Sequence, residues 1–180
     1  MEKAGKEIHH RSFSGFALIF ILFSCFIDIA CNIITFVRVA YVLDTDVVVA
    51  ALRSDKGASR QLLLAALNRH FELLLSVPLI IEYEAVLSRP EHLAASGLSS
   101  AEVSRVLDDV AAVAKPVRLA FRWRPQLGDP DDDMVLETAV NGNAHAIVTF
   151  NQRDFLPAAR DFNCDVILPA LALQKIRSYS

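Results

Sequence analysis

Short apolar runs alternate with amphipathic stretches along the chain from about residue 37 to the C-terminus. The runs have the length of strands buried on both faces, and the stretches between them repeat apolar residues at helical spacing. Strands are predicted at 39–43, 71–75, 117–119, 146–149 and 166–168, and helices at 46–53, 59–68, 78–88, 99–114, 128–140 and 169–176. Because strands alternate with helices, the predicted fold class is α/β, a three-layer α/β/α arrangement with a central parallel sheet. Residues 37–180 are predicted to form one domain.

Residues that start and stop helices support these boundaries. Ser99 and Glu102 form a capping-box pattern at the start of a helix. Arg89-Pro90 ends the preceding helix, because a residue before proline is biased away from helical angles. Asn141-Gly142-Asn143 supplies another helix stop, and Pro157 is predicted to start only a short turn.

Residues 1–36 form an apolar N-terminal extension that does not share this alternation. Residues 12–37 hold one charge, Asp28, and are long enough for a spanning helix of ~20 apolar residues. Asp28 would cost roughly 2.5–3.5 kcal/mol on insertion. Three interpretations stay open: a dispensable tail or start-site artefact with translation starting near Val37, a membrane anchor, or a cleaved signal peptide. We expect a cytoplasmic protein, membrane-anchored if the apolar segment is real and retained.

Composition and charge narrow the class of protein only slightly. The formal net charge of −3 provides no strong basic field for nucleic acids, although a local basic rim would suffice. Cys25, Cys31 and Cys164 are odd in number and irregularly spaced, which indicates neither a disulfide framework nor a zinc site. A reducing, intracellular compartment is therefore expected for the folded part.

Acidic residues gather where predicted strands end and where one helix begins. Asp44 follows the first strand, Asp154 lies just past the strand that ends at Thr149, and four acids occur within residues 129–133 at a helix start. Glu82 lies inside an otherwise apolar helix. In open α/β sheets, ligands bind outside the carboxyl ends of the strands. These acids are therefore candidates for one functional site.

Each acid also has a purely structural interpretation. Asp44 and Asp46 could cap the helix that follows them, and Asp154 could be an ordinary loop acid. Glu82 could be a solvated surface acid, with Glu84 as its competitor for a functional role. The acids at 129–133 could complement a helix dipole, although that explains one or two of them rather than four.

Taken together, the acids favour a divalent-metal site. Carboxylates that lie close together repel one another and have raised pKa values unless a cation lies among them. Oxygen ligands without clustered His or Cys indicate Mg²⁺ or Mn²⁺ rather than zinc. Such a metal lowers the pKa of bound water and holds phosphate oxygens, which is the chemistry of phosphodiester hydrolysis. The sequence has no Gly-x-Ser-x-Gly pattern and no Gly-rich phosphate-binding loop.

Four segments of the chain resemble the motifs of the PIN domain, found in VapC-type toxins. Val42-Leu43-Asp44-Thr45-Asp46-Val47-Val48-Val49-Ala50-Ala51-Leu52 is similar to the first motif, and Ile81-Glu82-Tyr83-Glu84-Ala85-Val86-Leu87-Ser88-Arg89-Pro90 is similar to the second. Asp129-Pro130-Asp131-Asp132-Asp133, with the helix to Ala139, resembles the third, and residues 147–155 resemble the last. The matches occur in the family's order and span about residues 37–173.

The resemblance implies a PIN-like nuclease domain at 37–180, namely an Mg²⁺- or Mn²⁺-dependent endoribonuclease that is the toxin of a type II toxin–antitoxin pair. Its catalytic and metal-binding acids would be Asp44, Glu82, Asp132 and Asp154, with Asp133 as a rival to Asp132, and Asp46, Thr149 and Asn151 as supporting residues. The implied partners are RNA, a cognate antitoxin and a second copy of the chain. The family usually has Asn at the place of Asp46, and many members have Asp at the place of Asn151.

Two other functions stay open. The Asn151 departure is compatible with a catalytically inactive PIN-like module that binds RNA or an antitoxin. Residues 44–48 also match the opening motif of haloacid dehalogenase-like phosphatases, but none of Lys56, Lys115 and Lys175 lies in the context which that family needs. The segment that holds Arg118, Arg122, Trp123 and Arg124 places cations beside an aromatic side chain, a combination that can contact the RNA backbone and stack on a base. A solvated connector with Trp123 packed inward is the alternative for that segment.

Overall fold

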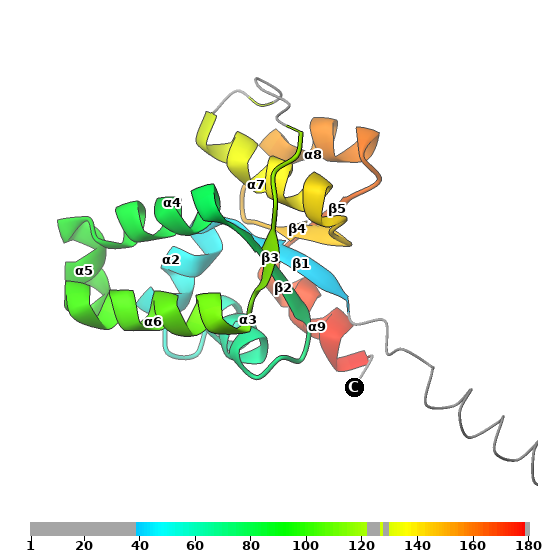
Figure 1. Cartoon of the computed structure of the whole chain (residues 1–180). Helices are drawn as coiled ribbons and strands as arrows, with labels where there is room; N and C mark the ends of the chain where they lie inside the picture. Colours follow the sequence, from blue (N-terminus) through cyan, green and yellow to red (C-terminus); the bar gives the residue numbers. More distant parts are fainter. Residues whose placement is uncertain (1–38, 122–126, 128–129, 179–180) are drawn as a thin grey trace, which may run out of the picture. The chain divides into compact units, whose positions relative to one another are not determined.

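A computed structural model describes residues 39–121, 127 and 130–178. Five strands form one sheet in the order β3-β2-β1-β4-β5, and every neighbouring pair is parallel (Figure 1). The strands are β1 (Ala40–Leu43), β2 (Glu72–Ser76), β3 (Lys115–Val117), β4 (Ala146–Val148) and β5 (Asp165–Ile167). The predicted α/β class with a central parallel sheet is confirmed.

Helices cover both faces of this sheet. The described helices are α2 (Thr45–Arg53), α3 (Ala58–Leu67), α4 (Val77–Leu87), α5 (Pro90–Ser96), α6 (Ser100–Val113), α7 (Pro130–Gly142), α8 (Gln152–Asp161) and α9 (Pro169–Ser178). In Figure 1, α7 and α8 lie above the sheet, whereas α3 and α9 lie below it. Helices α4, α5 and α6 form an excursion between β2 and β3, and α2 packs against α3, α4 and α5.

The central strands are buried because their sequences are apolar on both faces. All four residues of β1 and all three of β4 are buried, and Val42, Ile147 and Val148 have no exposed surface. Burial of an aliphatic side chain of this size contributes about 1.5–3 kcal/mol. The β1–β4 pair is therefore a rigid base for the polar residues that follow each strand.

Two short elements, helix α5 and strand β3, differ from the prediction. Pro90 does end the preceding helix, but it also opens α5, a seven-residue helix that ends at Gly97 with φ 71°. Helix α5 has no buried residue, so it lacks the apolar periodicity that would reveal it. Strand β3 spans 115–117 instead of 117–119 and includes Pro116. Because β3 is an edge strand, a residue without an N–H donor is tolerated there.

The prediction of a short turn at Pro157 is wrong, because Pro157 lies inside α8. An interior proline removes one helical hydrogen bond and costs ~3 kcal/mol or more. Phe155, Ala158 and Ala159 nevertheless bury one face of α8. Tertiary packing of that face, rather than helix propensity, therefore maintains the helix.

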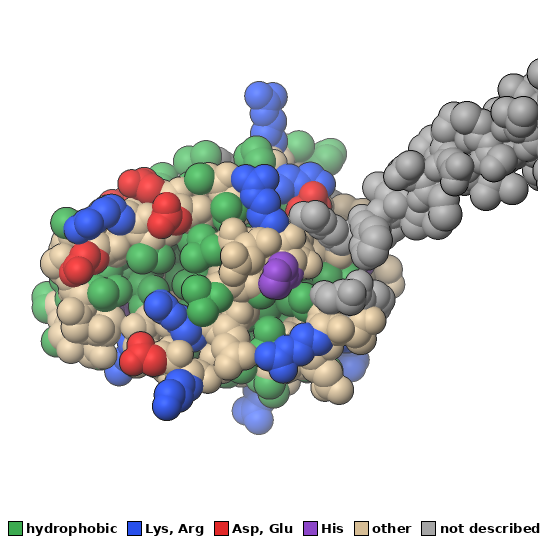
Figure 2. Space-filling view, turned by 90° about the horizontal axis from the view of Figure 1, so that it is seen from below, with side chains coloured by type: hydrophobic (Ala, Val, Ile, Leu, Met, Phe, Trp, Pro, Cys, Tyr) green, Lys and Arg blue, Asp and Glu red, His purple; other side chains and the backbone are tan. Residues whose placement is uncertain are grey.

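The apolar extension and part of the predicted RNA-contacting segment lie outside the described residues. Within the described part, no helix combines the length and apolar character needed to cross a membrane. Figure 2 shows the face below the sheet, where Lys and Arg side chains are interspersed with apolar and acidic ones. The visible part of that face presents no continuous basic surface, as expected from the small net charge of −3.

Candidate active site

Asp44 lies at the carboxyl end of the central strand β1, and its side chain is only 5% exposed. The Asp44 amide donates to the Val148 carbonyl at 2.9 Å, which continues the β1–β4 ladder. Asp44 occupies the N-cap position of α2, but its side chain makes no capping hydrogen bond. Its Oδ2 instead accepts the hydroxyl of Thr149 at 2.6 Å. The interpretation of Asp44 as a helix cap is thus not supported.

Asp46, in the first turn of α2, joins the same group of side chains. Its Oδ2 accepts the amide of Phe150 at 3.0 Å and lies 3.5 Å from the Thr149 hydroxyl oxygen. Its Oδ1 is buried and has no hydrogen-bond partner in the described part of the chain. A buried acceptor of this kind costs free energy unless a cation or a donor satisfies it.

The electrostatics of the cluster disfavour full ionisation. Burial, followed by the negative charge of Asp46 and that of Asp132, raises the pKa of Asp44 to about 7, against the opposing hydrogen bond from Thr149. Burial also raises the pKa of Asp46, although the Phe150 amide opposes the rise. A bound cation would remove the penalty on both carboxylates, since opposite charge favours the ionised form.

Helix α7 supplies both members of the predicted pair Asp132 and Asp133, and they occupy different environments. Asp132 is half-buried, and its charge contributes to the raised pKa of Asp44. Asp133 is 1% exposed, and its Oδ1 accepts the amide of Leu127 at 3.0 Å. This contact ties Leu127 to α7. Asp132 therefore acts on the charge of the cluster, whereas Asp133 bonds to Leu127.

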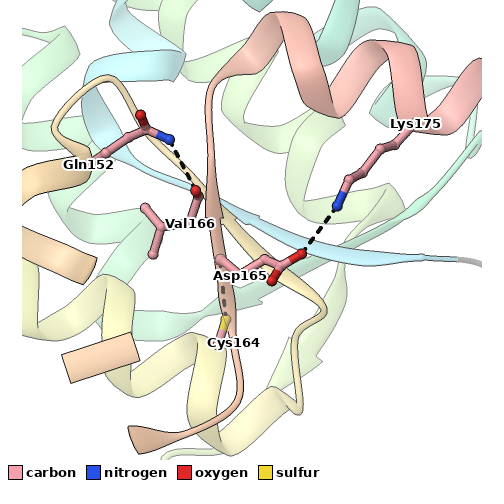
Figure 3. A network of polar contacts seen from close by, with 5 residues as sticks. All are labelled: Gln152, Cys164, Asp165, Val166 and Lys175. Atoms are coloured by element: carbon pink, nitrogen blue, oxygen red, sulfur yellow. Dashed lines mark hydrogen bonds and ion pairs between the residues drawn. The ribbon is translucent and has the colours of Figure 1, made fainter. Parts of the chain in front are cut away.

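Asn151 and Asp154 lie at the start of α8 and connect to the cluster through Thr149. The Asn151 amide donates to the Thr149 hydroxyl oxygen at 2.8 Å, and the Asn151 side-chain amide donates to Asp154 Oδ2 at 2.6 Å. Gln152 donates to the Val166 carbonyl at 3.0 Å, which anchors the same turn on β5 (Figure 3). Asp154 itself is exposed, at the solvent side of this chain of contacts.

Glu82 is half-buried on α4, and its neighbour Tyr83 fixes that helix to the cluster. The Tyr83 hydroxyl donates to the carbonyl of Leu43, the residue before Asp44. Burial, followed by the charges of Asp44 and Asp46, raises the pKa of Tyr83 well above its ordinary value. The phenol therefore remains a donor at physiological pH.

Sequence reasoning assigned no role to Tyr83 or to Glu137, a fully buried acid one turn after Asp133. Tyr83 stands between two acids in its motif, and nothing in that pattern distinguishes an anchoring phenol. Glu137 lies among the apolar positions of α7. An acid at an apolar position of a helix is the sequence feature that could have identified Glu137 as a buried polar residue. Its neighbour Thr138 is hydrogen-bonded to Ser76 at 2.7 Å, which ties α7 to the end of β2.

The donor set fits a hard divalent cation that keeps part of its water shell. Mg²⁺ is commonly held by one or two carboxylates together with waters and substrate phosphates. Asp44 and Asp46 supply such carboxylates, and the unpartnered Oδ1 of Asp46 is an acceptor that a cation would satisfy. Among the described residues, no group of three or more His, Cys, Asp or Glu side chains is positioned to hold a metal ion together. Asp129 and the side chain of Asp131 lie outside that part.

Replacing the hydroxyl of Thr149 by a methyl group, as in Thr149→Val, is expected to raise the pKa of Asp44 further above about 7. The hydrogen bond favours the ionised carboxylate by about 1.5–3 kcal/mol, equivalent to about one to two pH units. A ¹³C NMR titration of the Asp carboxyl signals in EDTA measures this change. Thr138→Val removes another buried hydroxyl and serves as the control. An unchanged Asp44 titration in Thr149→Val would contradict the assigned contact.

Comparison with known proteins adds two findings. A family model described as "PIN domain" matches residues 40–153. Among solved structures, the chain is similar to one titled "Crystal structure of VapBC2 from Rickettsia felis bound to a DNA fragment from their promoter". The identity is 16%, the match covers 71% of this chain and 96% of that chain, and the TM-score is 0.47. No curated protein matches the chain.

Proposed function

The chain belongs to the PIN-domain family, and on this premise we propose that it is a metal-dependent endoribonuclease that hydrolyses RNA phosphodiester bonds. PIN domains are generally nucleases. The observation that carries the proposal is the pair formed by buried Asp44 and half-buried Asp46, which share Thr149 and leave one Asp46 oxygen with no hydrogen-bond partner among the described residues. The family assignment sets aside the haloacid dehalogenase alternative.

We assign the acids distinct places around the reacting phosphate. Asp44 and Asp46 would hold an Mg²⁺ or Mn²⁺ ion, and Glu82, Asp132 and Asp154 would complete its surroundings directly or through water. When bound, the ion lowers the pKa of water and neutralises charge on phosphate oxygens. Thr149 orients the Asp44 carboxylate by its 2.6 Å hydrogen bond.

The rest of the cluster holds these groups still. Tyr83 fixes α4 to the end of β1, and Gln152 fixes the start of α8 to β5. The positive end of the α2 dipole lies beside Asp44 and Asp46 and stabilises their ionised forms. Preorganised groups of this kind lower the cost of reorganisation during the reaction.

The resemblance of four motifs to VapC-type toxins supports the further proposal that the enzyme is the toxin of a type II toxin–antitoxin pair. Under this proposal it acts on RNA in the cytoplasm, binds a cognate antitoxin and forms a homodimer. The competing function is an inactive PIN-like module that binds RNA or antitoxin. The observation that favours this inactive module is that the chain has Asn151 where many members of the family have Asp.

Incubation of the full-length protein with single-stranded RNA tests the nuclease. We expect cleavage with Mn²⁺ and none with EDTA. Attack by water with departure of the 3′-oxygen leaves a 5′-phosphate on one product and a 3′-hydroxyl on the other. Attack by the RNA 2′-hydroxyl with departure of the 5′-oxygen would instead leave a 2′,3′-cyclic phosphate and a 5′-hydroxyl. Analysis of the product ends by mass spectrometry should therefore find 5′-phosphates.

Two results would contradict the nuclease proposal. Cleavage that persists in EDTA and leaves cyclic phosphates would indicate a metal-independent nuclease. Absence of cleavage of varied RNAs by the folded protein, together with Mn²⁺-independent RNA binding, would establish the binding module instead.

A further inference from the structure

A cavity of about 400 Å³ lies between α2, α4 and α5, directly beside the acidic cluster. Its volume is within the roughly 300–1,000 Å³ that is typical of small-molecule sites. Asp46 belongs to both features, because it lines the cavity and bonds to the Phe150 amide in the cluster. Any group that enters the cavity therefore lies next to the proposed hydrolytic centre.

Besides Thr45 and Asp46, the lining of the cavity combines three kinds of surface. Val49, Ala50 and Val86 form apolar walls from two helices. His92 contributes its imidazole ring to the lining, and Nδ1 of that ring has no hydrogen-bond partner in the described part of the chain. Arg53, exposed in the last turn of α2, adds a cation. The apolar walls suit the face of a nucleobase, the imidazole suits the polar edge of the base, and the cation suits a phosphate of the nucleotide.

We propose that this cavity binds the nucleobase adjacent to the scissile phosphate of RNA, with His92 hydrogen-bonded to the base edge and Arg53 on a neighbouring phosphate. The proposal rests on the ribonuclease function and deepens it by naming residues that determine which RNA is bound. Single-stranded RNA is recognised through splayed bases that stack on side chains and hydrogen-bond along their edges. An imidazole can be donor or acceptor, so His92 can match either kind of base edge.

Charge favours RNA over a protein segment as the occupant. A peptide that placed a cationic side chain in this cavity would bring it near Arg53, which lines the same cavity, and like charges repel. A phosphate next to Arg53 instead gains a charge-assisted, two-point contact with the guanidinium. Helix α5, which carries His92, has no buried residue, and His92 itself is half-buried, so part of this residue is accessible from solvent.

RNA binding in EDTA tests the inference without requiring hydrolysis. The probe is fluorescein-labelled single-stranded RNA of random sequence, and the readout is the Kd from fluorescence anisotropy with the full-length protein. His92→Ala and Arg53→Ala are each expected to raise Kd by about 5- to 20-fold, the effect of losing one edge contact or one phosphate contact. His70→Ala and Arg105→Ala change the same residue types on other helices or loops and should leave Kd unchanged.

A second measurement reports on the cavity itself. In the ¹H–¹⁵N spectrum of the histidine side chains, the His92 signals should shift on addition of at least one of the four nucleoside 5′-monophosphates, while those of His70 should not. Unchanged Kd in both Arg53→Ala and His92→Ala would overturn the proposal and leave the cavity to a protein partner. If the His92→Ala and Arg53→Ala variants bind RNA more weakly but the wild-type protein cleaves no RNA, the base site is upheld and only the nuclease proposal is contradicted. If the wild-type protein cleaves RNA and both variants keep its Kd, the nuclease proposal is upheld and the base site is contradicted.

Discussion

Asp44→Asn is expected to lower the rate of RNA cleavage in Mn²⁺ by roughly 10²–10³-fold, the usual cost of removing one group that stabilises charge in the transition state. The substitution keeps the size of the side chain and an oxygen that can accept the Thr149 hydroxyl. It removes the negative charge that would hold the cation. Single-turnover cleavage of a labelled RNA, with enzyme in excess, measures the loss.

The control for this prediction is Asp109→Asn, which neutralises an exposed acid on α6. It should cleave RNA at the wild-type rate. Circular dichroism should show that Asp44→Asn keeps its secondary structure, because the side chain it replaces carries a destabilising rather than a stabilising charge. A wild-type rate in Asp44→Asn would remove Asp44 from the hydrolytic centre.

The second large effect concerns the stability of the metal-free protein. The pKa of Asp44 is about 7 in the folded protein against an ordinary value of 3.8. As pH rises from about 4 to 7, the unfolded chain loses this proton before the folded protein does. Folding stability therefore falls with pH over that interval and stays at the lower level above it. Each pH unit between the two pKa values is worth about 1.4 kcal/mol, so the loss reaches about 4 kcal/mol.

Urea unfolding in EDTA at pH 4, 5.5 and 8 measures this loss. Asp44→Asn should be more stable than the wild-type protein at pH 8 and nearly equal to it at pH 4. Mn²⁺ added at pH 8 should restore stability to the wild-type protein by mass action, and much less to the variant. Parallel pH profiles for the two proteins in EDTA would contradict the raised pKa of Asp44.

Much of the fold was predictable from local pattern. The strands β1, β2, β4 and β5 are short apolar runs, and Ser99 and Glu102 form the capping box that their spacing predicts. Helix α5 was missed because it buries no residue, and the other misplaced elements are those that packing or an edge position permits against local preference. Pro157 inside α8 and Pro116 within β3 are the clearest cases.

The site was predictable in outline and not in detail. The rule that ligands bind at the carboxyl ends of parallel strands identifies Asp44 and Thr149, 105 residues apart, as neighbours. The rule does not distinguish Asp132 from Asp133, because that choice depends on how α7 is rotated against the sheet. It also says nothing of His92, whose importance depends on an unpartnered atom beside a cavity.

Isothermal titration calorimetry with Mn²⁺ and the full-length protein at pH 8 tests most directly whether this acidic cluster is a metal site. We predict saturable binding to the wild-type protein that is weakened at least about tenfold in Asp44→Asn and is unchanged in Asp109→Asn. Equal Mn²⁺ affinity in all three proteins would contradict the assignment of a metal site to this cluster.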